Sequence, residues 1–341
     1  MKIIQVGSSG WAAGWLEYIH NEPEAELAAI VSRGGPKFEQ TKEKWQIPDE
    51  ICYTDYDEAL RCDADLVIVA MPHKYHVQYA RKAVLAGKNV LIEKPLTDDL
   101  DEAKEFLRFM EGRREKAFVS QNYRFRPQLW QMKASFGEDN IGEPAWANVT
   151  FRHGVTNEKF SEKTAWQRKD WRLEQTSLLL LEVAIHHFDM LRFVSGSDVK
   201  NVYARGWNPA WSDLRGIGSA FVLLEFENGF KANYSVTEKS IGFPCGYQAN
   251  WIMQTDRGAV IWENDEPNRL DMSLGLEGHL REDFYFPGKD RAGVLKEVMR
   301  ELRGEEGAVP TVFDNIRSLA VSFAVLRSIE EDRTVELSEI L

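Results

Sequence analysis

The chain has 341 residues, a length at which a single hydrophobic core usually gives way to two domains. Hydrophobic residues make up 43% and charged residues 28%, which is typical of a soluble globular protein, and no run of about 18 apolar residues is present to span a membrane. The net charge of −12 argues against nucleic acid or an anionic membrane as the main partner, so an anionic ligand must be held by local donors.

The first third of the chain alternates short apolar runs with amphipathic segments. The run 65–70 is almost entirely apolar, as expected for a strand buried on both faces of a parallel sheet. This alternation predicts an α/β Rossmann domain, a doubly wound parallel sheet, over residues 1–121. The expected strands are 2–6, 26–32, 65–70, 89–93 and 117–121, and the expected helices are 11–20, 37–45, 74–86 and 100–111.

From residue 122 the pattern changes to strands that alternate in hydrophobicity, with a strong hairpin signal at Asn228-Gly229. We expect 122–341 to form an α+β domain with a mainly antiparallel sheet, its last helix packing back on the first domain. The segments 154–171 and 205–217 are predicted as lid or binding loops, or else as mobile surface segments. The expected strands are 146–152, 220–227, 230–237, 250–255 and 259–262, and the expected helices are 127–135, 178–194 and 315–328.

The three cysteines, Cys52, Cys62 and Cys245, form no C-x-x-C pair. An odd, sparse set favours reduced thiols over a disulfide framework or a zinc site. The amino-terminal residues also lack the apolar core of a signal peptide. We therefore expect a cytoplasmic protein.

A loop of small residues joins the first predicted strand to the first helix. Gly7 and Ala12 take the first and third positions of the dinucleotide-binding pattern G-x-G-x-x-G/A, and Ser9 stands where the second glycine is expected. Small residues are needed there because the backbone must touch a pyrophosphate, with donors from the helix N-terminus. An ordinary tight turn is the alternative, but the βαβ pattern favours a nucleotide site. The predicted contacts are Gly7, Ser8, Ser9, Gly10, Trp11 and Ala12.

The end of the second strand usually discriminates between the two nicotinamide cofactors. A carboxylate there binds the adenosine ribose hydroxyls of NAD. This chain instead has Ser32 and Arg33, which can donate to a 2′-phosphate and neutralise it, although Arg33 can also be a solvated loop residue. We expect NADP to be preferred, with NAD possible.

Three other segments contain residues that can bind a cofactor or take part in catalysis. Met71, Pro72, His73 and His76 follow the strand 65–70, and Glu93-Lys94-Pro95 ends the next strand at the same edge, where such sheets bind ligands. We predict cofactor contacts from this edge. Farther on, one helix carries a carboxylate, a histidine and a second carboxylate at spacings of four and three, which places them on one face. The predicted contacts at the edge are Met71, Pro72, His73, His76, Glu93, Lys94 and Gln121, and the helix residues are Glu182, His186 and Asp189.

These segments together resemble the glucose-fructose oxidoreductase/inositol dehydrogenase family (Gfo/Idh/MocA). The matching segments occur in the family's order and cover nearly the whole chain. The motifs most specific to the family are E-K-P at Glu93 and the downstream H-x-x-D at His186. The further matching stretches are Pro72…His76, 86–96, 122–127, Trp171-Arg172, 185–189 and 328–337.

The resemblance implies that a nicotinamide cofactor oxidises or reduces a sugar, cyclitol or related polyol. By position Lys94 is the catalytic lysine and His186 exchanges the substrate proton. Glu182 stands where the family commonly has an aspartate, and it would orient His186 or raise its basicity. As a cation, Lys94 would stabilise the alkoxide or polarise the carbonyl. The resemblance also implies that the domain 122–341 binds substrate and mediates oligomerisation. Relatives commonly associate through the open face of the second sheet, which implies a homo-oligomer, a dimer or tetramer.

Other residues have two interpretations each. Tyr123 and Arg124 are predicted to bind substrate hydroxyls, with packing at the domain junction as the alternative. Trp171 and Arg172 are predicted to border the substrate, with structural burial as the alternative. His187 is interpreted as a packing residue. We predict no metal site, because His73 and His76 lack a third ligand.

Two further functions remain open. Ser9 and Glu182 depart from the family pattern, which favours a catalytically silent sensor or regulator that binds a nicotinamide dinucleotide; the retained Lys94 and His186 speak against it. Non-redox chemistry that uses the cofactor transiently, such as glycosidic cleavage, is the third possibility.

Overall fold

The computed structural model describes residues 1–341 except 138–139, 155–178, 213, 243, 264–270 and 275–279. The chain forms two compact units, Met1–Phe125 with Pro287–Ile316, and Arg126–Phe286 with Arg317–Leu341. The division differs from the boundary expected at residue 121, because the segment Pro287–Ile316 returns to the first unit. Its helix α8 (Arg291–Leu302), which was not predicted, packs against α1 (Trp15–Asn21) there.

The first unit holds a six-stranded sheet in the order β3-β2-β1-β4-β5-β6, in which every neighbouring pair is parallel. This is the doubly wound order, so the predicted Rossmann fold is confirmed. The strand order reverses between β1 and β4, and ligands bind such sheets at the carboxyl ends of the strands on either side of that point. The strands are β1 (Lys2–Val6), β2 (Glu26–Val31), β3 (Cys52–Tyr53), β4 (Leu66–Val69), β5 (Asn89–Glu93) and β6 (Ala117–Ser120).

Apolar side chains explain why these strands lie in the centre of the unit. All four residues of β4 are buried, as its continuous apolar run predicted. The helix expected over 11–20 begins with a 3₁₀ turn, and its α-helical part starts only at Trp15, whose indole is fully buried. The helical segments are η1 (Ala12–Gly14), α1, α2 (Pro36–Trp45), η2 (Asp49–Ile51), α3 (Tyr56–Ala59), η3 (His73–Tyr75), α4 (His76–Leu85), α5 (Leu100–Met110), η4 (Asn122–Phe125) and α8.

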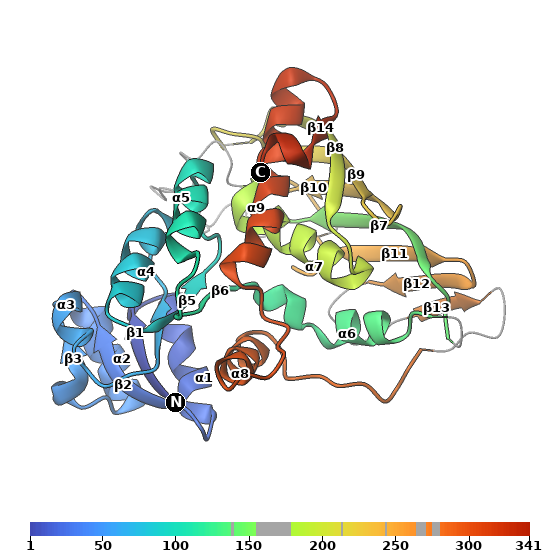
Figure 1. Ribbon diagram of the computed structural model, residues 1–341. Coiled ribbons are helices and arrows are strands. Elements are labelled where there is room, and N and C mark those ends of the chain that lie inside the picture. Colours follow the sequence, from blue (N-terminus) through green and yellow to red (C-terminus); the bar gives the residue numbers. More distant parts are fainter. Residues whose placement is uncertain (138–139, 155–178, 213, 243, 264–270, 275–279) are drawn as a thin grey trace. The chain divides into compact units, whose positions relative to one another are not determined.

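The second unit contains an eight-stranded sheet in the order β13-β12-β11-β7-β10-β9-β8-β14 (Figure 1). Its pairs are antiparallel except for β10 with β7, which confirms the predicted α+β class. The strands are β7 (Pro144–Arg152), β8 (Val199–Trp207), β9 (Ser219–Phe226), β10 (Lys231–Thr237), β11 (Asn250–Thr255), β12 (Gly258–Trp262), β13 (Asp271–Leu274) and β14 (Val335–Glu336). Because β8 extends to Trp207, the expected loop over 205–217 was placed too early.

Helices cover one face of this sheet. Phe188 of α7 (Ile185–Ser195) meets the buried ring of Tyr234 on β10 edge-on, with ring centroids 5.4 Å apart. The long helix expected over 178–194 is instead a π-helical turn, η8 (Leu179–Ala184), followed by α7. The other helical segments are α6 (Pro127–Ala134), α9 (Val312–Glu331), which begins in the first unit, and η9 (Leu337–Glu339). No helix within the described ranges is long and apolar enough to cross a membrane.

Candidate active site

The glycine loop after β1 has a shape that only small residues permit. Gly7 adopts φ +102°, and a Cβ there would lie 2.4 Å from the carbonyl oxygen of Ala70, so any other residue would collide with the end of β4. Gly10 also has positive φ, at +56°. The buried Gln5 amide donates to the carbonyls of Gly7 and Ala12 at 2.9 and 3.0 Å, which fixes both ends of the loop. Sequence reasoning did not identify Gln5.

The side chains of this loop differ in exposure. Ser8 is buried, and its hydroxyl donates to Ser32 Oγ at 2.6 Å. Ser9 is exposed, as is Trp11, at 58%. Ser32 Oγ also accepts from the Gly34 backbone at 3.2 Å, whereas the neighbouring Arg33 is exposed. Ser32 therefore shapes the turn after β2, and Arg33 presents its charge to solvent.

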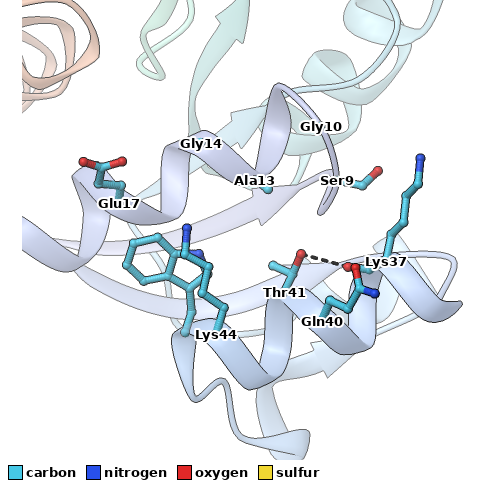
Figure 2. A pocket seen from close by; sticks show the side chains of 10 residues that line it. Ser9, Gly10, Ala13, Gly14, Glu17, Lys37, Gln40, Thr41 and Lys44 are labelled. Carbon is cyan, nitrogen blue, oxygen red and sulfur yellow. Dashed lines mark hydrogen bonds between the residues drawn. The ribbon is translucent and has the colours of Figure 1, made fainter. Parts of the chain in front are cut away.

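A pocket of about 530 Å³ lies next to this loop (Figure 2). The glycine loop and α1 form one wall of the pocket, and α2 forms the other. The Thr41 hydroxyl, on the α2 side, lies 3.1 Å from the Ser8 carbonyl and 2.9 Å from the Lys37 carbonyl, and its single proton can be donated to either. Lys37 and Lys44 contribute positive charge to the wall opposite Glu17. The residues that line it are Ser9, Gly10, Ala13, Gly14, Glu17, Lys37, Gln40, Thr41, Lys44 and Trp45.

Two histidines connect the loops after β4 and β5. The His76 imidazole lies 2.8 Å from the Pro95 carbonyl through Nδ1 and 2.7 Å from the Met71 carbonyl through Nε2, and burial lowers its pKa. His73 Nε2 lies 3.3 Å from Asp98 Oδ2, and this contact lowers the pKa of the Asp98 carboxyl. Both rings therefore support the strand ends. Among the described residues, no three His, Cys, Asp or Glu side chains gather as a metal site would require.

Glu93 is a buried carboxylate at this edge that accepts several hydrogen bonds. It is 4% exposed, and its Oε1 accepts from the Trp15 indole at 2.7 Å and from Arg291 Nη2 at 2.9 Å. Its Oε2 accepts from the backbone N–H of Lys94 at 3.3 Å. The Lys94–Pro95 peptide bond is cis. Lys94 therefore follows a strand end that is fixed by hydrogen bonds from the Trp15 indole, the Arg291 guanidinium and the Lys94 backbone N–H.

The end of β6 provides a further polar group. Gln121 is fully buried, and neither its side-chain oxygen nor its nitrogen has a hydrogen-bond partner within the described part of the chain. Arg124 is also buried; its guanidinium donates to the Ala308 carbonyl and to Asp314, each at 3.1 Å. These contacts tie Arg124 to the returning segment of the first unit. Tyr123 is half-buried.

The second unit positions the predicted histidine and carboxylates. His186 lies in the first turn of α7 and is 5% exposed, while Glu182 belongs to the π-helical turn. Hydrogen bonds in a π-helix span five residues, so the offset of four does not here give the α-helical spacing that we assumed, and such turns are frequent at functional sites. The fully buried Asp189 accepts from Ser318 Oγ at 3.1 Å. Trp171 and Arg172 lie outside the described residues.

A cluster at the ends of β7 and β10 was not found from the sequence. His153 Nδ1 lies 3.0 Å from Glu238, and its Nε2 lies 3.2 Å from the Tyr247 hydroxyl. The Glu238 carboxylate raises the pKa of His153. The backbone carbonyl of Tyr247 lies 2.8 Å from Nε2 of His187, the neighbour of His186 on α7. This cluster is therefore connected to the helix that carries the predicted proton carrier.

Comparison with known proteins agrees with this fold. Residues 1–121 match the NAD-binding Rossmann domain of the Gfo/Idh/MocA oxidoreductases, and residues 129–258 match a C-terminal domain of the same proteins. Inositol 2-dehydrogenase of Rhizobium meliloti (strain 1021) is 25% identical over 81% of this chain and 82% of its own length.

Two solved structures have the same fold over almost the entire chain. An oxidoreductase from Agrobacterium radiobacter in complex with NAD+, L-tartaric acid and magnesium has a TM-score of 0.83 at 21% identity, over 100% of this chain and 99% of that one. Aldose-aldose oxidoreductase from Caulobacter crescentus, complexed with glycerol, has a TM-score of 0.79 at 20% identity, over 98% of this chain and 99% of that one.

Proposed function

The chain belongs to the Gfo/Idh/MocA family of oxidoreductases, with an NAD-binding Rossmann domain and the family's C-terminal domain, and on that premise we propose that it interconverts an alcohol and a carbonyl on a sugar, cyclitol or related polyol. The observation that carries the proposal is the anchored Glu93 carboxylate, which holds the start of the Lys94 loop at the carboxyl edge of the sheet. That edge also carries the glycine loop. Ligands bind there in doubly wound sheets.

The residues of the first unit fit a nicotinamide dinucleotide. The positive φ values of Gly7 and Gly10 give the tight turn that a pyrophosphate-binding loop needs, and the buried Gln121 amide has donor and acceptor capacity for a carboxamide. Ser8, Gly10, Trp11 and Ala12 complete the proposed loop contacts, with Met71, Pro72, His73, His76 and Glu93 as neighbours. When bound, the nicotinamide supplies the site that accepts or donates a hydride.

We assign the proton chemistry to the chain's own side chains. During oxidation a neutral His186 imidazole takes the proton of the substrate hydroxyl, and during reduction it returns that proton. The Lys94 ammonium stabilises the negative charge that develops on the same oxygen. Glu182 orients His186. These roles make Lys94, His186 and Glu182 the proposed catalytic residues.

Substrate contacts are proposed from several segments of the chain. Tyr123, Arg124, Trp171 and Arg172 remain the candidates from the family pattern. The Tyr247 hydroxyl, half-exposed and paired with His153, is a further candidate for a substrate hydroxyl. Inositol 2-dehydrogenase of Rhizobium meliloti supports a polyol as substrate.

For the cofactor we propose NADP in preference to NAD. No carboxylate follows β2; Arg33 is exposed beside the turn, and Lys37 lines the adjoining pocket together with Ser9. An exposed arginine after the strand and a lysine on the wall of the adjoining pocket suit a 2′-phosphate better than a ribose diol.

We also propose that the protein forms a homo-oligomer, a dimer or tetramer, through the uncovered face of the second sheet. Alternation along the strands turns large apolar side chains outward there, where a second copy would bury them. These side chains are Trp146, Trp207, Phe221, Leu223 and Ile252.

A panel of sugars, cyclitols and their keto forms, offered with each cofactor, tests the proposed reaction. We expect one class of compound to change the absorbance of the reduced nicotinamide. Tight cofactor binding without turnover of any compound would favour the sensor, and product formation without net absorbance change would favour transient use of the cofactor.

A further inference from the structure

Arg291, the first residue of α8, lies inside the first unit although it is far from the dinucleotide loop in sequence. Its side chain is 6% exposed. Nη2 donates to Glu93 Oε1 at 2.9 Å, and Nη1 donates to the backbone carbonyl of Trp11 at 3.1 Å. One guanidinium therefore joins the glycine loop to the strand end that precedes Lys94.

The rings around the guanidinium strengthen this contact. Its central carbon lies 4.0 Å from the centre of the Trp11 ring and 4.9 Å from that of Trp15. Trp15 donates to the same Glu93 oxygen that receives Arg291. A planar cation that lies over two indole rings gains cation–π attraction as well as hydrogen bonds.

Gly14 provides the space that Arg291 requires. A Cβ at Gly14 would lie 2.6 Å from Nη1 of Arg291, so a side chain there would displace the guanidinium. The φ of this glycine is not among the positive values, so the backbone does not demand glycine at this position. The space that Arg291 needs is therefore a specific reason for a glycine at position 14.

We propose that Arg291 is a positioning residue that holds the dinucleotide loop and the Lys94-bearing end of β5 in one fixed arrangement. The inference rests on the proposed function, because it assigns to Lys94 and the loop the roles given above. The guanidinium has the fork geometry that this task needs: one nitrogen reaches the Glu93 carboxylate while another reaches the Trp11 carbonyl. A lysine has only one charged nitrogen, so it cannot reach the Glu93 carboxylate and the Trp11 carbonyl from two separate nitrogens as the guanidinium does.

Arg291→Lys is the first test, because it keeps the charge beside the buried carboxylate. We expect about tenfold weaker NADPH binding, measured by fluorescence titration, from loss of the contact to the loop. We expect kcat to fall by up to about 100-fold, since small displacements of a reacting group cost that much. Thermal unfolding of the variant should remain close to that of the parent protein.

Arg291→Ala with added guanidinium chloride at non-denaturing concentration is the second test. The ion should enter the vacated space and restore both NADPH affinity and kcat in part, which a general loss of stability would not allow. Arg303→Gln, at the other end of α8, is the matched control, because its ion pair with Glu24 is exposed. That control should bind and turn over NADPH as the parent does, with or without guanidinium.

The outcomes separate the two proposals. If the parent protein binds no nicotinamide dinucleotide, the proposed function fails. If the parent binds NADPH and Arg291→Lys binds and turns over with unchanged constants, the function stands and the positioning role is refuted. If Arg291→Ala does not fold, Arg291→Lys decides alone. A stability loss in Arg291→Lys with unchanged affinity and kcat would also refute the positioning role.

Discussion

Nδ1 of His187 lies 2.7 Å from the hydroxyl of Tyr234, and both side chains are fully buried between α7 and the second sheet. Nε2 donates to the Tyr247 carbonyl, so Nδ1 is the acceptor and the ring is a neutral tautomer that has both partners. Burial lowers the pKa of His187 from its ordinary 6.5 to about 4. This agrees with the interpretation of His187 as a packing residue.

The lowered pKa predicts a loss of stability in acid. Between the two pKa values the unfolded chain binds a proton that the folded chain does not, so the free energy of unfolding falls as pH decreases from about 6.5 to about 4. Titration of His187 alone should lower the free energy of unfolding by about 2 kcal/mol when the pH falls from neutral to about 4.5. Urea unfolding of the parent and of His187→Gln at both pH values measures it. An equal acid loss in the two proteins would contradict the assignment.

Lys94→Met tests the proposed charge at the reacting oxygen. We expect kcat to fall by about 100-fold to 1000-fold or more, because one stabilising donor is removed, while NADPH affinity stays nearly unchanged. Steady-state kinetics and fluorescence titration measure the two effects. Lys82→Met is the control, since Lys82 pairs with Asp57 on the surface. Near-normal turnover of Lys94→Met would disprove its role.

His186→Asn tests the proton carrier. The rate should fall by about 100-fold or more, and its dependence on pH near neutrality should flatten, because asparagine has no titrating group in this range. A pH–rate profile of both proteins measures this. If the profile of the variant kept the shape of the parent's, another group would be the proton carrier.

Arg33→Gln tests the cofactor preference. We expect NADPH to bind about tenfold more weakly and NADH to bind as before, since only NADPH has a phosphate for the guanidinium to contact. Titration of both reduced cofactors measures the difference, with Arg61→Gln as an exposed control on another element. Tighter binding of NADH than of NADPH by the parent protein would contradict the preference itself.

Local periodicity predicted much of the fold. The continuous apolar run of β4 and the alternation of β9, in which Phe221, Leu223 and Glu225 face outward, show directly which faces are buried. The turn at Asn228-Gly229 joins β9 to β10 as expected. Such features depend on neighbours in sequence, which is why a single chain reveals them.

Contacts between distant segments could not be predicted in this way. Arg291 and Glu93 are 198 residues apart, and His153 and Tyr247 are 94 apart. Nothing in the local pattern of either partner indicates the other. The π-helical turn at Glu182 was also missed, because an apolar helix with one extra residue in a turn looks continuous in sequence.

The central claim is that Lys94 and His186 act on one substrate oxygen beside the nicotinamide. A crystal structure with NADP⁺ and a polyol identified by the substrate panel tests it most directly. We predict that the Lys94 ammonium and the His186 imidazole both lie within hydrogen-bond distance, about 2.6–3.2 Å, of the hydroxyl whose carbon faces the nicotinamide ring. A complex in which either group points away from that hydroxyl would contradict the account.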